Sequence, residues 1–325
     1  MSYVVSFLSL AIKFATVFLF GATGEIVNQK SGHLNMGTPG IMYLGALGGI
    51  VGERIYLSSI PADAPLNPLL IVFIPVVFAI IFGALGGAIF SFFTVTLRCN
   101  QNVTGLTLTT LGVGIACYFI GSIDTSRMAE AGLLMQHAFS GYEAAGWFGE
   151  IFLSQSWFTY LGVVIAILAA VILRYTRVGL NLRAVGENAS AADQAGVNVS
   201  AYRYVATIIG GAISGIGGAF YELDNVKGMF NVADGIDAFG WLALCIVIFS
   251  LWRPTIAIFA SFFFACLSVA PTFFAPYLAG AGYVRYLLMM VPYVATIIVL
   301  IVTSVVSKKD HAPASLGVPY FREDR

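Results

Sequence analysis

Long apolar segments, separated by short polar or Gly/Pro-rich stretches, run through almost the whole chain. Most of them approach the roughly 20 residues that an α-helix needs to cross about 30 Å of hydrocarbon. Their apolar runs are continuous rather than alternating, which favours helices over a transmembrane β-barrel. The pattern predicts an all-α, polytopic transmembrane helical bundle of about eight to ten spans. The candidate spans cover residues 4–23, 38–57, 69–97, 103–122, 157–174, 202–222, 236–251, 254–274 and 284–306.

Two of these spans carry signs of an interruption. The segment 236–251 is short enough to be a re-entrant or half helix, and the segment 38–57 starts with Thr38, Pro39 and Gly40, which favours a break in its first turn. The first span holds Lys13 near its middle and lacks a basic start and a small-residue cleavage site, so we expect a retained helix and not a signal peptide. Lys13 is either a functional charge or a lysine that snorkels or is buried in the bundle.

Composition supports a membrane protein and excludes other classes. Of the 325 residues, 59% are hydrophobic and 10% are charged, whereas soluble domains carry about 25% charged residues. The formal net charge is zero, which argues against a nucleic-acid partner because such proteins have a basic surplus. The four cysteines have no C-x-x-C spacing and are interpreted as small hydrophobic residues.

The distribution of charge predicts how the chain sits in the bilayer. Basic residues cluster between the fifth and sixth spans and in the tail 307–325, and acidic residues dominate the loop 122–156. Cytoplasmic loops are enriched in Lys and Arg, so we expect the tail and the basic loop on the cytoplasmic side and the N-terminus outside. The residues concerned are Arg174, Arg177, Arg183, Arg203, Lys308, Lys309, Arg322 and Arg325 on the basic side, and Asp124, Glu130, Glu143 and Glu150, with a single Arg127, in the acidic loop.

Motifs for energy conversion are missing from the sequence. It contains no G-x-x-x-x-G-K-[ST] phosphate loop, no H-E-x-x-H and no G-x-S-x-G. Proton- or sodium-coupled carriers commonly show buried acidic or histidine relays, and none is evident in the predicted spans. We therefore expect a transport subunit that is not itself an enzyme and has no cofactor of its own, as one part of a larger machine. A stand-alone secondary carrier or a membrane-embedded enzyme would need an ion site or an acid/base cluster.

The basic loop between the fifth and sixth spans contains a predicted short helix. Asn188 is a plausible N-cap, the residues up to Ala195 are good helix formers, and Gly196 stands where a helix would stop. Its small residues permit close docking against another protein, and Glu187 and Asp193 offer polar contacts at the rim. On the residues alone, a docking helix and an ordinary amphipathic connector remain equal alternatives.

Several motifs resemble the permeases of ABC importers for simple sugars, branched-chain amino acids and nucleosides. The segment from Gly186 to Val199 reads G-E-N-x-x-A-A-D-x-A-G-V-N-V and resembles the coupling segment of that family. The tail from Pro313 to Tyr320 resembles the ending of the shorter permeases of nucleoside importers that use a basic-membrane-protein-type lipoprotein receptor. The other resembling stretches are Gly24-Glu25-Ile26 with Ser31 to Gly37, Leu251-Trp252-Arg253-Pro254, and Pro292-Tyr293 with Thr296 and Val299.

The resemblance implies a permease domain over residues 1–306 in the bacterial inner membrane, moving nucleosides by ATP-driven alternating access. The implied partners are a second homologous permease, ATPase subunits that bind ATP and Mg, and an external lipoprotein receptor. In the family the coupling helix, here near 186–196, sits in a cleft of the ATPase, which implies contact through Gly186, Glu187, Ala191, Ala192, Asp193 and Gly196. Ribose or another simple sugar is the alternative substrate. Pro39 stands where many relatives have an acidic residue, which puts the substrate assignment in doubt.

Two further features concern the helices themselves. The Gly-rich stretches around Gly83/Gly87 and Gly211/Gly215 resemble each other, either as an inverted repeat or by chance, and their four-residue spacing predicts close helix packing.

The break before the second span is the candidate substrate path, because irregular backbone at membrane depth must be buried or line a cavity. Asn35 either bonds a sugar hydroxyl or base edge there or only caps the helix. The predicted path residues are Asn35, Met36, Gly37, Thr38 and Gly40.

Overall fold

A computed structural model describes residues 3–61, 65–120, 128–135, 138–139, 141–227, 235–274, 283–306 and 312–321. Several charged residues used above to orient the chain lie outside this part: Asp124, Arg127, Lys308, Lys309, Arg322 and Arg325. The side chains of Glu130 and Glu143 also lie outside it. The orientation of the chain in the bilayer stays a prediction.

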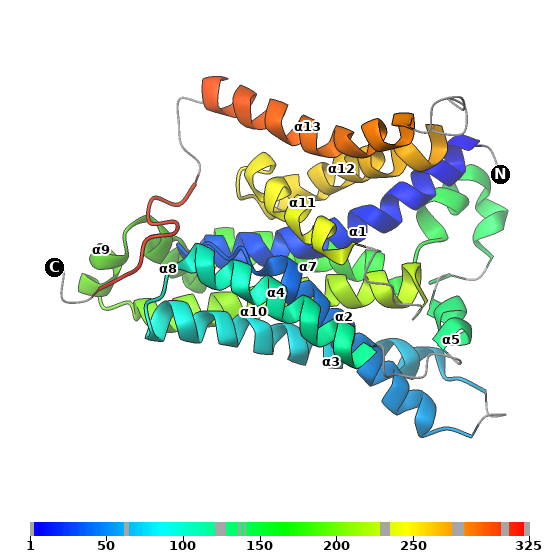
Figure 1. Ribbon diagram of the computed structural model, residues 1–325, viewed down its shortest axis with the longest axis horizontal. Coiled ribbons are helices and arrows are strands. Elements are labelled where there is room, and N and C mark those ends of the chain that lie inside the picture. The colour runs from blue at the N-terminus through cyan, green and yellow to red at the C-terminus, as the bar shows by residue number, and fades with distance from the viewer. Residues whose placement is uncertain are drawn as a thin grey trace.

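The described part of the chain is helical throughout and contains no strand, as predicted (Figure 1). The long helices are α1 (Tyr3–Gln29), α2 (Thr38–Ser58), α3 (Pro68–Ser91), α4 (Gln101–Ile120), α7 (Trp157–Tyr175), α10 (Val199–Phe220), α11 (Ile236–Phe249), α12 (Pro254–Phe274) and α13 (Tyr283–Val306). Shorter ones are α5 (Met128–Met135), α6 (Gly146–Phe148), α8 (Arg177–Glu187) and α9 (Ala189–Gln194). The π-helical turns η1 (Phe92–Thr96), η3 (Gly149–Leu153) and η4 (Tyr221–Asn225) and the 3-10 turn η2 (Tyr142–Ala145) complete the described elements.

The predicted spans match the long helices one for one. Six helices are long and apolar enough to cross a membrane within the described residues, namely α1, α3 with η1, α4, α7, α10 with η4, and α12. The main differences are at ends: α1 continues to Gln29, six residues beyond the predicted 4–23. The short helix α11 has 14 residues, or about 21 Å at 1.5 Å per residue, which leaves it short of a full span. It packs against α1 and α2.

Helix α10 is the centre of the bundle, and glycines let its backbone touch three neighbours. A Cβ on Gly24 of α1 would lie 2.3 Å from the Gly210 oxygen, and one on Gly45 of α2 would lie 2.2 Å from Gly215 Cα. On α3, a Cβ at Gly83 would lie 2.4 Å from the Gly211 oxygen. These approaches confirm that the predicted glycine stretches pack helices together. The two stretches pack against each other on antiparallel helices (Figure 1), and the inverted repeat stays a prediction.

The bundle has two distinct ends. Helices α8 and α9 lie at one end together with the last described residues, here called the α9 end, and the N-terminus and α5 lie at the opposite end (Figure 1). Apolar side chains on α3, α4 and α7 remain exposed between the ends, among them Phe73, Leu85 and Ile167, as expected for surfaces that face lipid or another subunit. The path of the helices places the N-terminus and the basic loop on opposite ends, as the predicted topology requires.

Candidate functional site

The break between α1 and α2 lies at the α9 end. After Gln29 the chain leaves the helix through a turn in which Gly32 takes the left-handed conformation, with φ of +85°, and α2 starts at Thr38. The irregular segment therefore precedes the second span rather than interrupting its first turn. Pro39 is tolerated because it stands at the first positions of the helix, where its missing N–H costs no intrahelical bond.

Glu25 holds this break in place. Its side chain is 2% exposed, and its Oε1 accepts hydrogen bonds from Gln29 Nε2 at 3.0 Å and from the backbone N–H of Asn35 at 3.1 Å. Asn28 Nδ2 donates to both carboxylate oxygens at 3.3 Å, and Thr38 Oγ1 donates to Oε2 at 2.9 Å. One carboxylate thus ties together the end of α1, the break and the start of α2. We name Glu25, Asn28, Gln29, Asn35 and Thr38 the break cluster.

Asn35 lies in the break and bonds backbone. Its side chain is buried, and its Oδ1 accepts a 2.8 Å hydrogen bond from the backbone N–H of Gly37. This is a local Asx-type turn that fixes the entry to α2, and it corresponds to the capping alternative. Asn35 does not line any of the four cavities described by their residues, which lie at α7 and α10, beside α9, on α4 and at the C-terminal segment 312–321.

The other predicted path residues are packed against α4. A Cβ on Gly40 would lie 2.4 Å from the Leu108 oxygen, and one on Gly37 would lie 3.1 Å from the Gly105 oxygen. Thr109 Oγ1 donates to the Met36 carbonyl at 3.1 Å. The structure therefore brings Asn35, Met36, Gly37, Thr38 and Gly40 together, with α4 closing over them. Their role as a substrate path stays a prediction.

His33 and Trp252 extend the break cluster to α10 and to the turn between α11 and α12. His33 Nδ1 lies 3.3 Å from Thr207 Oγ1 of α10, which donates to Asn28 Oδ1 at 2.7 Å. Burial, with a smaller contribution from the positive charge of Arg203, lowers the pKa of His33 to about 3, so its ring is neutral at physiological pH. Trp252 Nε1 donates to Gln29 Oε1 at 2.6 Å.

The predicted short helix in the basic loop is α9. Asn188 caps it, because its Oδ1 accepts from the backbone N–H of Ala191 at 2.9 Å, and Gly196 ends it in the left-handed conformation with φ of +85°. Both features confirm the sequence prediction. The structure adds α8, which precedes α9 and is joined to it at Asn188.

The six residues predicted to contact an ATPase do not all face outward. Glu187, Ala191 and Gly196 are exposed, and Asp193 is half-buried. Ala192 is buried in a small apolar cluster with Val185 and Val199. Gly186 is buried too, because a Cβ there would lie 2.3 Å from the Lys30 oxygen. Only the exposed members of the set present a surface to a partner; Ala192 and Gly186 hold α9 against the rest of the bundle.

The C-terminal segment 312–321 ties α9 to the break. Ser315 N–H donates to the Gly186 carbonyl at 2.9 Å, and Gly317 N–H donates to the Gly32 carbonyl at 3.0 Å. Tyr320 donates its hydroxyl hydrogen to Asp193 Oδ2 at 2.9 Å. We call residues 312–321 the tail strap, since it bonds α9, the α8–α9 junction and the break turn at once.

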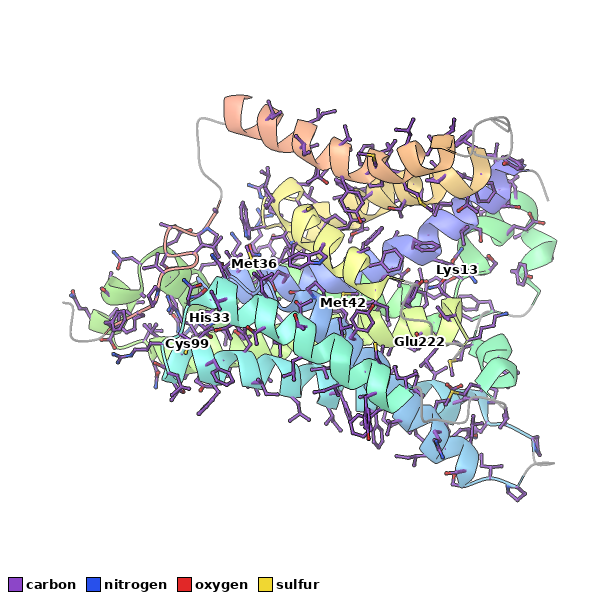
Figure 2. The ribbon with its side chains drawn as sticks, in the orientation of Figure 1. Lys13, His33, Met36, Met42, Cys99 and Glu222 are labelled. Atoms are coloured by element: carbon purple, nitrogen blue, oxygen red, sulfur yellow. The ribbon has the colours of Figure 1, made fainter. Side chains whose placement is uncertain are left out.

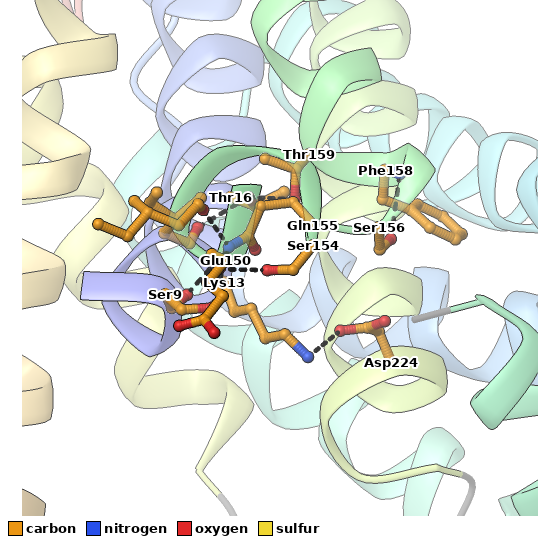
Figure 3. A network of polar contacts seen from close by, with 12 residues as sticks. Ser9, Lys13, Thr16, Glu150, Ser154, Gln155, Ser156, Phe158, Thr159 and Asp224 are labelled. Carbon is orange, nitrogen blue, oxygen red and sulfur yellow. Dashed lines mark hydrogen bonds and ion pairs between the residues drawn. The ribbon is translucent and has the colours of Figure 1, made fainter. Parts of the chain in front are cut away.

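A second polar region lies near the opposite end of the bundle (Figure 2). Lys13 Nζ of α1 lies 3.6 Å from Asp224 Oδ2 of η4, and their side chains are 19% and 0% exposed. Above this pair, Thr16 Oγ1 donates to Thr159 Oγ1 at 3.1 Å, and Gln155 Nε2 donates to Ser9 Oγ at 3.2 Å (Figure 3). Lys13 is therefore half-buried in the bundle and paired, and both of its predicted roles stay open.

Sequence reasoning missed the hub role of Glu25 and the Lys13–Asp224 pair. The stripe Glu25, Asn28 and Gln29, spaced i, i+3 and i+4 at the end of an apolar helix, could have indicated the first. No local signal could have indicated the second, because its partners are far apart in the chain. Among the described residues, no group of three or more His, Cys, Asp or Glu side chains is placed to hold a metal ion.

Comparison with known proteins gives similarity along nearly the whole chain. The chain is 31% identical over 320 residues to the nucleoside ABC transporter permease protein NupC of Lactococcus lactis, covering 95% of this chain and 94% of the relative. It is 28% identical to the guanosine ABC transporter permease protein NupQ of Bacillus subtilis, over 96% and 95% of the two chains. A putative glucose ABC transporter permease of Haloferax volcanii is 29% identical over 82% of this chain and 77% of its own length.

No solved structure matches the chain significantly. A family model described as the branched-chain amino acid transport system permease component matches residues 6–302. That range includes the break cluster, α9 and every helix that is long and apolar enough to span a membrane. The chain is therefore a multi-pass membrane protein that belongs to the family of branched-chain amino acid transport system permease components.

Proposed function

We propose that this protein is the transmembrane permease subunit of an ATP-binding-cassette importer that moves nucleosides. The observation that carries the proposal is the similarity to a nucleoside permease over 95% of the chain. This similarity covers the predicted substrate path and the predicted coupling helix α9 together. A guanosine permease is similar over a comparable length. The exposed side of α9 supports the same role, since it offers small residues at the end of the bundle where a soluble partner can dock.

The proposed mechanism is alternating access driven by a partner. ATPase subunits bind ATP and Mg, and their closure moves α9. The bonds of Gly186 and the tail strap carry this movement to the turn at Gly32, and Glu25 passes it to the start of α2. The chain's own residues make and break no covalent bond in this cycle; they bind, pack and move.

The location, the orientation in the membrane and the partner subunits complete the proposed importer. We place the α9 end and the C-terminus in the cytoplasm of a bacterial cell, with the protein in its inner membrane. The partners are a second homologous permease, the ATPases and an external lipoprotein receptor at the opposite end. The permease NupB of Lactococcus lactis, 24% identical over 74% of this chain, supports a second homologous permease of the same kind.

A simple sugar is the second candidate substrate, because a putative glucose permease is also similar. Pro39 bears on this choice. Its ring contacts α11, where a Cβ on Gly240 would lie 2.5 Å from Pro39 Cα. The acidic residue of many relatives would stand at this contact between α2 and α11, so its replacement by proline removes a charge from the predicted path.

Reconstituted uptake tests the substrate. The complete importer in vesicles, supplied with ATP, is given a panel of nucleosides and pentoses, each at the same concentration. Saturable, ATP-dependent uptake of nucleosides is expected. Uptake of sugars without nucleosides would overturn the substrate assignment, and uptake driven by an ion gradient without the ATPase would overturn the importer class.

A substitution on α9 tests the coupling role. Ala191→Glu places a charged side chain on the exposed side of α9, where it is expected to abolish co-purification of the ATPase. Ala144→Glu, at an exposed alanine near the other end, is the matched control and should retain the ATPase. If both variants keep the ATPase and full uptake, α9 is not the docking helix.

A further inference from the structure

A polar cavity of about 360 Å³ lies beside α9 at the start of α10. Three parts of the chain form its walls: η1 with Arg98 after it, the segment from Asp193 of α9 to the start of α10, and the tail strap. Arg98, Arg203 and Tyr320 are among its lining residues, together with Asn198, Val199 and Ser200. We call it the α10 pocket. No residue of the break cluster lines the pocket, whereas Asp193 and Gly196 of the predicted ATPase-contact set do.

The pocket favours an anion. Two arginines line it against one acidic side chain, Asp193, and that carboxylate already accepts a hydrogen bond from Tyr320. The 22-residue helix α10 starts in its wall, and the first amide groups of a helix carry partial positive charge and lack intrahelical partners. Asn198 caps one of them, Ala201 N–H, at 3.0 Å. Val199 and Ser200, the first two residues of α10, are among the residues that line the cavity.

Arg203 is the independent sign of a missing ligand. It is 3% exposed, and its Nη1 donates to the Val318 carbonyl at 3.3 Å. Its Nε and Nη2 are buried and have no hydrogen-bond partner among the described residues. Buried guanidinium nitrogens without partners are costly, and an oxyanion at this wall of the pocket would satisfy them. Arginine is also the side chain that best matches the geometry of phosphate oxygens.

The surroundings indicate where the anion comes from. Phe93 and Leu97, next to the pocket on η1 and the residue after it, are 41% and 52% exposed. Arg98 is exposed, with its guanidinium 4.9 Å from the centre of the Phe321 ring. Apolar side chains beside an exposed arginine are typical of the membrane surface, where acyl chains and headgroup phosphates meet.

We propose that the α10 pocket binds the phosphate group of an anionic phospholipid, held by Arg98, Arg203 and the first amides of α10. The bound headgroup bridges η1 and the α9–α10 connection and so stabilises the position of the coupling helix. This site needs no substrate and no ATPase, so its test is independent of the proposed function.

The test measures lipid retention by the purified full-length chain with native mass spectrometry. The chain is offered phosphatidylglycerol or phosphatidylcholine in mixed micelles, and inorganic phosphate in a separate sample. Preferential retention of phosphatidylglycerol is expected, and Arg98→Gln should weaken it about fivefold, as one basic residue contributes about 1 kcal/mol near a membrane surface. Arg54→Gln removes an exposed arginine at the other end of the bundle and should change nothing.

Four outcomes would overturn the proposal. The first is equal retention of the two lipids, and the second is an equal loss in Arg98→Gln and Arg54→Gln. The third is thermal stabilisation by inorganic phosphate without retention of phosphatidylglycerol, which would assign the pocket to a soluble phosphate. Loss of ATPase co-purification in Arg98→Gln without any change in lipid retention would likewise assign the pocket to the subunit interface.

Discussion

Glu25 of α1 and Glu53 of α2 are both buried, but their carboxyl groups differ in their hydrogen bonding. Glu25 is 2% exposed and Glu53 is 1% exposed. Glu25 accepts hydrogen bonds from four residues of α1, the break and α2, whereas neither oxygen of Glu53 has a hydrogen-bond partner among the described residues. Burial alone therefore does not reveal the role of an acidic residue in a membrane helix.

The same contrast holds for the two ends of the bundle. At the α9 end, polar side chains from α1, α10 and the turn after α11 bond one another around the break. Toward the N-terminal end, Lys13 of α1 pairs with Asp224 of η4. Ionisable groups inside a bilayer are usually kept for function. The difference between the two ends shows that an ionisable group inside the bundle can instead stabilise the fold.

Removing Glu25 is expected to have the largest effect. Glu25→Ala leaves the donors of Gln29, Asn28, Asn35 and Thr38 without their acceptor, and a buried donor without a partner costs about 1–3 kcal/mol. We expect a total loss of about 3–5 kcal/mol in the free energy of unfolding, because some donors find other acceptors. Thermal unfolding of the purified protein in detergent measures it.

Glu53 supplies the control for that experiment. Glu53→Gln is close in shape and removes no hydrogen bond seen in the described residues, so its effect should stay below about 1 kcal/mol. Glu25→Gln retains one acceptor oxygen and is expected to fall between the two. Equal destabilisation by Glu25→Gln and Glu53→Gln would show that the contrast between the two carboxyl groups is wrong.

Breaking the pair at the N-terminal end should have the next largest effect. Lys13→Met removes the Lys13 ammonium from the fully buried carboxylate of Asp224, and we expect a loss of about 2–3 kcal/mol. Lys13→Arg keeps the charge and should recover most of the stability. In a double-mutant cycle with Asp224→Asn, the two changes should be non-additive by about 1 kcal/mol or more. Strict additivity would mean that the 3.6 Å contact contributes nothing.

Acid should weaken the α9 end through His33. Its pKa is about 3 in the folded protein and about 6.5 in the unfolded chain. Between these values the unfolded chain binds more protons, so stability falls as the pH drops below 6.5, and His33 contributes no slope above that pH. From pH 6.5 to pH 5 the loss is about 2 kcal/mol.

His33→Gln isolates this contribution, because the other titrating groups remain. The variant should unfold with a shallower dependence on pH over the same range, measured as the midpoint of thermal unfolding. His33 faces Thr207 at 3.3 Å and packs edge-on against Phe90, and Arg203 is the charged group that acts on it. If the unfolding midpoints of the original protein and of His33→Gln depend on pH in the same way, the pKa of His33 is not lowered by folding. His33 would then be in contact with solvent.

The sequence predicts the helices well and the contacts between distant segments poorly, for a physical reason. Hydropathy located the nine long helices because the bilayer requires about 20 apolar residues per span. Asn188 and Gly196 located α9 because caps act within one turn of the backbone. Gly83 and Gly211 indicate close helix packing, since small residues in membrane helices let neighbouring backbones approach each other.

Contacts between distant segments left no comparable signal. Lys13 and Asp224 meet only after the chain has crossed the bundle several times. The sequence places Glu25 near a span end and in a family motif, but it does not indicate that the acceptor oxygens of Glu25 join α1, the break and α2. The described conformation buries Asn35 and packs α4 against the break, and the substrate path at Asn35 stays a prediction.

The smallest expected effect concerns the tail strap, and it separates stability from coupling. Tyr320→Phe removes the hydroxyl that donates to Asp193 at 2.9 Å. The bond is only partly buried, so the expected cost in unfolding free energy is about 1 kcal/mol. Its consequence should be larger for transport, because this bond joins α9 directly to the strap that also bonds Gly32 and Gly186.

Uptake per ATP hydrolysed by the reconstituted importer measures that consequence. We expect Tyr320→Phe to lower this ratio while ATP hydrolysis continues, since α9 would move with less effect on the break. Tyr175→Phe removes an exposed hydroxyl at the same end of the bundle and is the matched control. If Tyr320→Phe changes stability but leaves the ratio at the level of the Tyr175→Phe control, the tail strap fastens the α9 end without transmitting its movement. The polar network around Glu25 would then receive its signal through Gly186 alone, which packs directly on the Lys30 carbonyl.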